Sequence, residues 1–180
     1  MHDSSVAVIG AGIGGLAAAL ALLRAGQRVR IYEQVPELAE VGAGLSITPN
    51  AGKALIALGL GPALERIGSQ PPAGVVRHYA TGADLVKLAQ DQSRERYGVA
   101  LCHVHRADLH ERLAEAVRHL DPDCLQLGHA LVLVRSHADG VDAEFANGRS
   151  IRADWLVGAD GVRSATRAQL FGPDQPRFTG

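Results

Sequence analysis

The stretch that decides the fold is VAVIGAGIGGLAAALALLRAGQRVRIYE, residues 6–33. It opens with four apolar residues, passes through a glycine-rich turn, and continues as an alanine- and leucine-rich run that meets no helix breaker before Gly26. Residues 28–33 then alternate, with Val29 and Ile31 on one face. This succession predicts a buried strand, a tight turn, a buried helix and a second strand. The two strands should therefore pair in parallel through a right-handed βαβ crossover.

The glycine-rich turn has the spacing G-x-G-x-x-G, formed by Gly10, Gly12 and Gly15. The pattern is common by itself, but here it follows a strand, opens a helix and is followed 18 residues after Gly15 by Glu33. In a dinucleotide site Gly10 would allow the sharp turn, Gly12 the close approach of a pyrophosphate, and Gly15 the tight contact of helix and strand. The free N–H groups at the helix start would face the phosphates.

Glu33 narrows the choice of nucleotide. Its carboxylate can accept hydrogen bonds from both ribose hydroxyls, and its charge would repel a 2′-phosphate. We therefore expect FAD or NAD rather than NADP, and the turn alone does not distinguish these two. The alternative is a glycine-rich turn in an α/β protein that binds nothing.

Further elements are predicted along the rest of the chain. Gly59 should end a helix over residues 51–58, and two short strands should flank Gly82 within residues 74–88. Residues 105–120 form an amphipathic pattern typical of a helix. Its apolar face consists of Leu109, Leu113, Ala116, Val117 and Leu120.

A three-stranded antiparallel meander is predicted between residues 129 and 158. Asp139-Gly140 and Asn147-Gly148 have the composition of type I′ hairpin turns, and they separate three strand-like runs. The third run leads without a break into GADGVRSATR, residues 158–167, and a helix is expected over residues 163–170.

Composition excludes several classes of protein. The 180 residues are 47% hydrophobic and 21% charged, with 18 basic and 19 acidic side chains, which argues against disorder and against a nucleic-acid or membrane-binding surface. Residues 6–23 carry no charge, but their glycines and the absence of a basic segment before them argue against a membrane span or signal peptide. The two cysteines form no CxxC motif and are too few for a disulfide framework, so a cytoplasmic protein is expected. The length of 180 residues predicts a single domain.

Four motifs, in order and at comparable spacing, resemble the flavoprotein aromatic hydroxylases. They are GAGIGGLAAALALLRAGQRVRIYE, VGAGLSITPNAGKALIALGL, HRADLHERL and GADGVRSATR. This family of single-component FAD monooxygenases includes salicylate, 3-hydroxybenzoate and 6-hydroxynicotinate hydroxylases. The resemblance covers the whole chain and implies an α/β, Rossmann-like FAD-binding fold with a βαβ start, the meander, and a partial substrate-domain sheet that includes residues 70–100.

The resemblance implies roles for several residues. Arg106 would reach the FAD pyrophosphate or ribityl chain, and the Leu131 backbone would meet the adenine. Asp160 would orient the cofactor if hydroxyls, water or N–H groups donate to it, while Arg163 and Arg167 would offset negative charge near FAD and NAD(P)H. The alternatives are a surface arginine, an ordinary core leucine and an Asp-Gly turn that caps a helix. The expected cofactor-binding set is Gly10, Gly12, Gly14, Gly15, Glu33, Gly44, Arg106, Leu131, Asp160 and Arg163.

The loop around Gly44 would let the backbone lie against the isoalloxazine ring. Ser46 occupies a position where the 6-hydroxynicotinate enzymes carry a histidine proposed as a base. Because a serine does not fill that role unaided, 6-hydroxynicotinate is disfavoured as substrate. No catalytic residue is assigned.

The histidines near residue 105 raise the question of a metal site. Cys102, His103 and His105 alternate along a strand, and His110 follows. No acidic cluster accompanies them, so we expect strand-edge and helix-face positions and no metal.

The implied reaction is hydroxylation of a small aromatic, phenolic acid-like substrate by bound FAD with NADH or NADPH and O₂ as co-substrates. The chain ends at about half the length of such an enzyme, so it is expected to be an incomplete FAD-binding domain. We expect it to be inactive alone, its partner being either the C-terminal half or a second copy. The alternatives are a non-catalytic dinucleotide-binding module and an NAD-dependent oxidoreductase.

Overall fold

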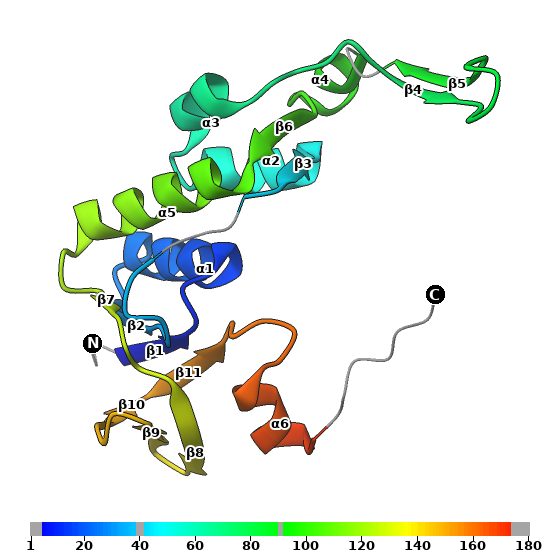
Figure 1. Ribbon diagram of the computed structural model, residues 1–180. Coiled ribbons are helices and arrows are strands. Elements are labelled where there is room, and N and C mark those ends of the chain that lie inside the picture. Colours follow the sequence, from blue (N-terminus) through cyan, green and yellow to red (C-terminus); the bar gives the residue numbers. More distant parts are fainter. Residues whose placement is uncertain (1–4, 39–41, 90–91, 174–180) are drawn as a thin grey trace. The chain divides into compact units, whose positions relative to one another are not determined.

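The computed structural model describes residues 5–38, 42–89 and 92–173. The chain divides into two compact units. Unit 1 comprises Met1–Ala39 and Leu113–Gly180, and unit 2 comprises Glu40–Arg112. Each is described separately below (Figure 1).

A four-stranded parallel sheet forms the centre of unit 1. Its order is β11 (Trp155–Gly158), β1 (Ser5–Ile9), β2 (Arg28–Tyr32) and β7 (Leu125–Gln126). Helix α1 (Ile13–Arg24) connects β1 to β2, which pair in parallel from Ser5 with Arg28 to Ile9 with Tyr32. The predicted strand, helix and strand are confirmed, because the apolar runs that define them are the buried core.

The two faces of this sheet are covered by different layers (Figure 1). Helix α1 lies on one face and buries Leu16, Ala19 and Leu20. The meander of β8 (Leu131–His137), β9 (Gly140–Phe145) and β10 (Ser150–Ala153) covers the other. Successive strand residues point to opposite faces, so β1 is buried on both. Its meander-facing residues Ala7 and Ile9 lie in clusters that include Val141, Ala153, Ala143 and Phe145.

The third strand of the predicted meander is in fact two strands. It is interrupted at Asp154, where the chain leaves β10 and enters β11 of the parallel sheet. The Asp154 Oδ2 atom accepts hydrogen bonds from Ser5 N–H at 2.6 Å and Ser5 Oγ at 2.8 Å. The Asp154 N–H donates to Ser5 O at 3.1 Å. These bonds fix the chain at the start of β1, so the meander ends at Ala153 rather than at residue 158.

The two meander turns occur where the sequence predicts them, but they are not type I′. A type I′ turn needs a positive φ at both central residues. Gly140 and Gly148 have φ of +150° and +81°, whereas no non-glycine residue in the described ranges has a positive φ. At the second turn the Asn147 side chain instead accepts a hydrogen bond from Arg149 N–H at 3.0 Å. This local bond stabilises an asparagine in an ordinary conformation.

Within its described residues, unit 1 contains two more helices. Helix α6 (Ala165–Phe171) starts two residues later than predicted, and Ser164 is its N-cap. Helix α5 (Arg106–Leu120) has its first turns in unit 2 and the remainder, from Leu113, in unit 1. Leu109, Leu113 and Val117 are buried as predicted, but Leu120 is 46% exposed.

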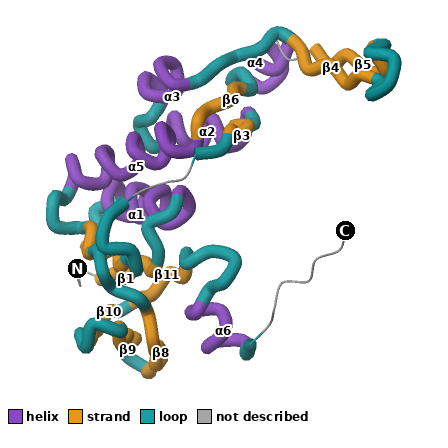
Figure 2. Tube along the Cα trace, in the orientation of Figure 1, coloured by secondary structure: helices purple, strands orange, loops and turns teal. Residues whose placement is uncertain are grey.

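Unit 2 is built around a two-stranded antiparallel sheet (Figure 2). Strand β3 (Gly44–Ile47) pairs with β6 (Cys102–His105). Besides the first turns of α5, the described part of the unit has the helices α2 (Pro49–Ala57), α3 (Gly61–Ile67) and α4 (Gln92–Tyr97). It also has a hairpin of β4 (Ala73–Arg77) with β5 (Asp84–Ala89). Gly59, with φ of +82°, follows α2 as predicted. Every residue of β5 is exposed.

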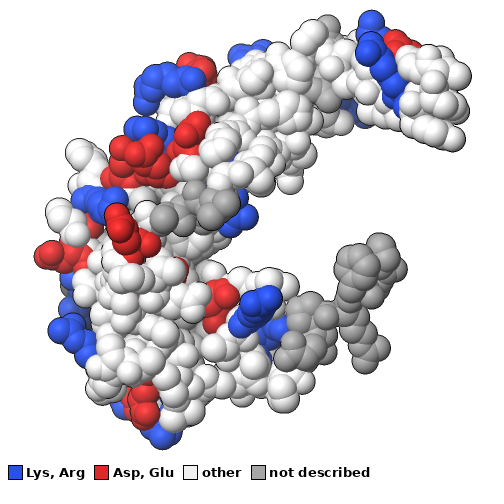
Figure 3. All heavy atoms as spheres, viewed as in Figure 1, with Lys and Arg blue, Asp and Glu red and all other residues white. Residues whose placement is uncertain are grey.

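The surface carries no dominant charge. On the face drawn in Figure 3, basic and acidic side chains are interspersed and neither sign forms a continuous patch. Within the described ranges, no helix has the length and hydropathy needed to cross a membrane.

Candidate nucleotide-binding site

The two glycine turns of the sequence lie against each other in unit 1. Because β1 and β11 are adjacent and parallel, the turns that follow them leave the sheet at the same edge. The Ala159 N–H donates to Ile9 O at 2.8 Å, which joins the two segments where the strands end. A Cβ on Gly10 would lie 2.5 Å from the Ala159 carbonyl oxygen and 3.0 Å from the Asp160 Cα. Residues about 150 positions apart thus form one edge of one sheet.

Gly10 and Gly15 are both required by close backbone packing. Gly10 has φ of +99°, a conformation that side chains other than glycine rarely adopt. A Cβ on Gly15 would stand 1.9 Å from the Gly10 carbonyl oxygen. The sharp turn and the tight contact of helix and strand that the spacing predicts are therefore present.

Gly12 and Gly14 face open space instead. A Cβ at either position would meet no atom within 4 Å. Gly12 is the N-cap of α1, no side chain caps it, and the first turn of α1 contains no acidic residue. The start of a helix carries N–H groups without an intrahelical partner and a partial positive charge. An anionic group could approach this backbone closely, so the turn fits a diphosphate.

Glu33 lies beside the same turn, immediately after β2. Its Oε2 atom accepts a hydrogen bond from the N–H of Ala11 at 2.7 Å, and its Oε1 atom accepts one from the N–H of Val35 at 3.1 Å. Each carboxylate oxygen has two lone pairs, so both can still accept hydroxyl donors. The backbone bonds hold the half-buried carboxylate in place at the glycine turn.

The Asp160 carboxylate is held by hydroxyl and N–H donors of its own segment. Ser164 Oγ donates to Oδ1 at 2.5 Å, while Thr166 N–H and Thr166 Oγ1 donate to Oδ2 at 2.9 and 3.1 Å. Burial tends to raise the pKa of Asp160, but the hydrogen bonds from Ser164 and Thr166 outweigh it and lower the pKa below the ordinary 3.8. Asp160 thus stays ionised, and its bond to Thr166 N–H also caps the first turn of α6.

The other predicted residues of unit 1 have ordinary surroundings. Arg163 is exposed on the turn between β11 and α6. Arg167 lies in α6, and its N–H donates to Ser164 Oγ at 2.9 Å. The Leu131 side chain packs against the cluster of Ile9, Ala143 and Phe145, so packing in the hydrophobic core accounts for an apolar residue at this position. The expected contacts of Arg163 and of the Leu131 backbone with a nucleotide stay predictions.

Gly44 and Arg106 belong to unit 2 and are close to each other there. Gly44 pairs with His105 across β3 and β6, and the N–H of Arg106 donates to Ala43 O at 2.9 Å. A Cβ on Gly44 would meet nothing within 4 Å, so the backbone at this position is open. Arg106 is half-buried at the first position of α5.

Three polar residues near the predicted positions were not assigned from sequence. Ser164 and Thr166 hold Asp160, and His103 Nδ1 is 3.0 Å from Ser46 Oγ. Ser164 carries a readable signal, because serine just before a helical run is a preferred N-cap. His103 carries none, because its contact depends on the register of β3 with β6.

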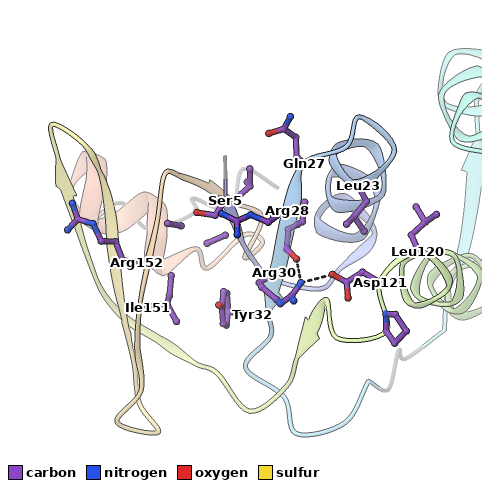
Figure 4. A pocket seen from close by; sticks show the side chains of 15 residues that line it. Ser5, Leu23, Gln27, Arg28, Arg30, Tyr32, Leu120, Asp121, Ile151 and Arg152 are labelled. Carbon is purple, nitrogen blue, oxygen red and sulfur yellow. Dashed lines mark hydrogen bonds and ion pairs between the residues drawn. The ribbon is translucent and has the colours of Figure 1, made fainter. Parts of the chain in front are cut away.

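A hollow lies at the amino ends of the parallel strands, at the opposite edge of the sheet from the glycine turns (Figure 4). It has a volume of about 690 Å³ and is bordered by Ser5 and Arg28 at the amino ends of β1 and β2. The Arg30 side chain lines the hollow, and its Nη1 atom donates a hydrogen bond to Asp121 Oδ2 at 2.5 Å. Nucleotides bind at the carboxyl ends of parallel strands, so this hollow is not the nucleotide site.

The histidines and cysteines of the described ranges form no group of three potential metal ligands, with or without acidic residues. His103 and His105 are exposed on one face of β6, and His110 is buried on α5. Cys102 is buried on the opposite face of β6. These are the strand and helix positions that the alternation predicts.

Comparisons with known proteins show the family of the chain. Residues 3–175 match the model of the FAD binding domain family. The chain is 39% identical to 6-hydroxynicotinate 3-monooxygenase of Pseudomonas fluorescens, over 97% of this chain and 45% of that protein. It is 42% identical to a 3-amino-4-hydroxybenzoate 2-monooxygenase of Streptomyces platensis, over 99% of this chain and 44% of that protein.

A solved structure gives the same result for the fold. HpxO of Klebsiella pneumoniae, complexed with FAD and uric acid, is 34% identical with a TM-score of 0.83 over 92% of this chain and 41% of that chain. The chain thus spans less than half the length of these relatives. The two adjacent glycine turns, the family match and the fold lead to one conclusion: the chain belongs to the FAD-binding domain family and corresponds to the FAD-binding region of flavoprotein monooxygenases.

Proposed function

We propose that this chain supplies the FAD-binding part of a monooxygenase that hydroxylates a small aromatic, phenolic acid-like substrate with NADH or NADPH and O₂. The named activities of its relatives support the aromatic substrate class, because they act on hydroxylated pyridine and benzoate rings. Since the chain spans about 45% of those proteins, the complete activity is proposed for a protein that also contains the remaining part, as a longer chain or an assembly.

The observation that carries the proposal is the contact between Gly10 and Ala159, which brings both glycine turns to the open start of α1. In this proposal the FAD diphosphate lies at Gly12 and Gly14, where the backbone is accessible. The Glu33 carboxylate beside it accepts hydrogen bonds from the hydroxyls of the adenosine ribose. Asp160, ionised and held by its own segment, orients the cofactor through a hydroxyl or a water molecule, and Arg163 offsets the negative charge.

Gly44, Arg106 and Leu131 extend the proposed set. The open backbone at Gly44 suits a flat ring that lies against the chain. The guanidinium of Arg106 offers paired donors of the kind that recognise a diphosphate. The Leu131 backbone would contact the adenine at the start of β8.

Bound FAD would supply the redox chemistry, taking reducing equivalents from NAD(P)H and activating O₂. The protein's residues would bind and orient the cofactor and keep water from the reacting ring.

The first test is titration of the purified chain with FAD and, in parallel, with NAD. We expect the protein to retain the visible absorption of FAD after unbound FAD is removed, and not to bind NAD. The second test uses FAD-loaded protein that also contains the remaining part. It adds phenolic acids and NADH or NADPH and compares the reductant consumed with the hydroxylated product formed. A folded chain that binds NAD and not FAD would contradict the proposal. FAD binding without hydroxylation, even with the remaining part of the protein present, would reduce it to a non-catalytic nucleotide-binding module.

A further inference from the structure

Ser46 and His103 form a hydrogen-bonded pair across the two strands of unit 2. They are directly opposite each other in the register of β3 with β6, and Ser46 Oγ lies 3.0 Å from His103 Nδ1. Both side chains are exposed on the same face of the sheet, whereas the opposite face is buried through Ile47, Cys102 and Val104. The pair is therefore accessible from outside while its strands are anchored from behind.

The backbone on both sides of His103 is fixed. β3 pairs with β6 on one side. On the other side Ser69 and His103 exchange two backbone hydrogen bonds, each 2.8 Å. The imidazole thus projects from a strand held on both edges. A hydroxyl paired with an imidazole nitrogen can pass its proton to the ring when it receives another.

Gly44 lies near this pair on β3, and its position indicates which substrate the pair would meet. Gly44 and Ser46 are two residues apart on one strand, so they share the exposed face at a spacing of roughly 7 Å. The inference rests on the proposed function, in which the ring of FAD lies against the open backbone at Gly44. A small aromatic substrate beside that ring would then lie within reach of Ser46.

We propose that Ser46 and His103 act together as the acceptor of the proton that the phenolic substrate loses during hydroxylation. The phenol O–H proton moves to Ser46 Oγ as the Ser46 hydroxyl proton moves to His103 Nδ1. The products are a phenolate and an imidazolium, so charge and protons balance. The exposed imidazolium returns the proton to water. Ser46 touches the substrate in this scheme, and His103 is a positioning residue that acts through it.

The pair also has a purely structural explanation, since cross-strand polar pairs stabilise sheets by about 0.2–1 kcal/mol. The two explanations differ in their dependence on substrate acidity. A proton acceptor matters for a phenol that is protonated in solution and is dispensable for a nitrophenol that is already ionised. A structural pair affects both substrates to the same extent.

The experiment compares Ser46→Ala, Ser46→Thr and His103→Gln in the FAD-loaded protein that contains this chain. For a weakly acidic phenolic acid, kcat should fall about 100-fold in Ser46→Ala and His103→Gln, at the lower end of general base catalysis. Ser46→Thr retains the hydroxyl and should recover most of the rate. With a nitrophenol that is ionised at the assay pH, all variants should match the wild type. Equal losses with both substrates, or no loss with either, would overturn the inference.

A binding measurement provides a readout that does not depend on turnover. The ultraviolet difference spectrum of a bound phenolic acid reports its ionisation. Because the pair carries the proton to water, it sets how fast the bound phenol ionises: after a rise in pH, phenolate should form more slowly in Ser46→Ala and His103→Gln than in the wild type. The same rate of ionisation in all three proteins would contradict the inference.

His137→Gln is the matched control, because His137 is also an exposed strand histidine bonded to a side chain, through Nε2 to Asp142 at 2.8 Å. It should leave both the rates and the spectra unchanged. Wild-type protein that binds no FAD, or that hydroxylates no phenol, would refute the proposed function itself. Wild-type hydroxylation with unaffected Ser46 and His103 variants would refute only the inference.

Discussion

A Cβ on Gly10 would lie 2.5 Å from the carbonyl oxygen of Ala159. The turn after the first strand and the turn after the last strand of the parallel sheet are thus in van der Waals contact. This contact results from the pairing of β1 with β11, because parallel neighbours direct their carboxyl ends to the same edge. The contact makes one site out of two segments at opposite ends of the chain.

Gly10→Ala should lower the free energy of unfolding by about 2 kcal/mol or more, since it adds both a strained φ and a backbone overlap. Gly26→Ala is the control, because Gly26 has φ of +78° but open space around its Cβ position. That change should cost only about 1 kcal/mol. Denaturant unfolding of both variants measures the difference. Equal losses would show that the contact with Ala159 contributes nothing.

Glu33→Ala should destabilise unit 1 and weaken FAD binding together. It removes the acceptor of the Ala11 N–H, and a hydrogen bond to a charged group contributes about 1.5 kcal/mol. Glu33→Gln keeps an acceptor oxygen and should lose less than about 1 kcal/mol. Unfolding curves and FAD titrations of both variants provide the check. If Glu33→Ala bound FAD as tightly as the wild type, the ribose role would be wrong.

Asp160→Asn should reduce stability at neutral pH by about 1 kcal/mol, because the half-exposed carboxylate loses charge-assisted bonds from Ser164 and Thr166. The folded protein has the lower pKa at Asp160, so ionised Asp160 stabilises it above the unfolded pKa. This contribution disappears as the pH falls through the folded pKa, below 3.8. Urea unfolding of wild type and variant at a series of pH values should show a difference that shrinks in acid. A difference that stays constant would contradict the lowered pKa.

The two cysteines should react only when the protein unfolds. Burial and the nearby Asp121 charge raise the pKa of Cys124 to about 11, and burial raises the pKa of Cys102. Because the thiolate is the reactive form, a thiol reagent near neutral pH should label neither residue in the native state. Mass spectrometry after timed labelling, with and without urea, measures this. Rapid native labelling of Cys124 would show that the core around it is open.

The local sequence pattern was sufficient to predict most elements of the fold. Residues 6–33 gave the first strand, helix and second strand, because each apolar run is a buried face. The break at Asp154 was not predictable, since it depends on bonds to Ser5, 149 positions away. The turn type at Asn147 was also missed, because its side chain bonds to the backbone and removes the need for a positive φ.

The candidate site was predictable to a similar degree. The glycine spacing correctly indicated which positions are packed tightly, Gly10 and Gly15, and which are open, Gly12. The requirement that donors surround Asp160 was inferred from its charge, but Thr166 as a donor follows only from the folded turn. The contact of Ser46 with His103 spans 57 residues and needs the sheet register, which no local pattern supplies.

FAD titration of Gly12→Ala tests the central claim most directly. Gly12 has an ordinary φ of −69° and no atom near its Cβ position, so alanine fits the fold. The added methyl group would instead occupy the space proposed for the diphosphate. We predict a loss of at most about 1 kcal/mol in the free energy of unfolding, because alanine is a poorer N-cap than glycine. We also predict at least about a tenfold loss of FAD affinity, or about 1.4 kcal/mol. Wild-type affinity in a normally folded Gly12→Ala protein would show that the diphosphate does not bind at this turn.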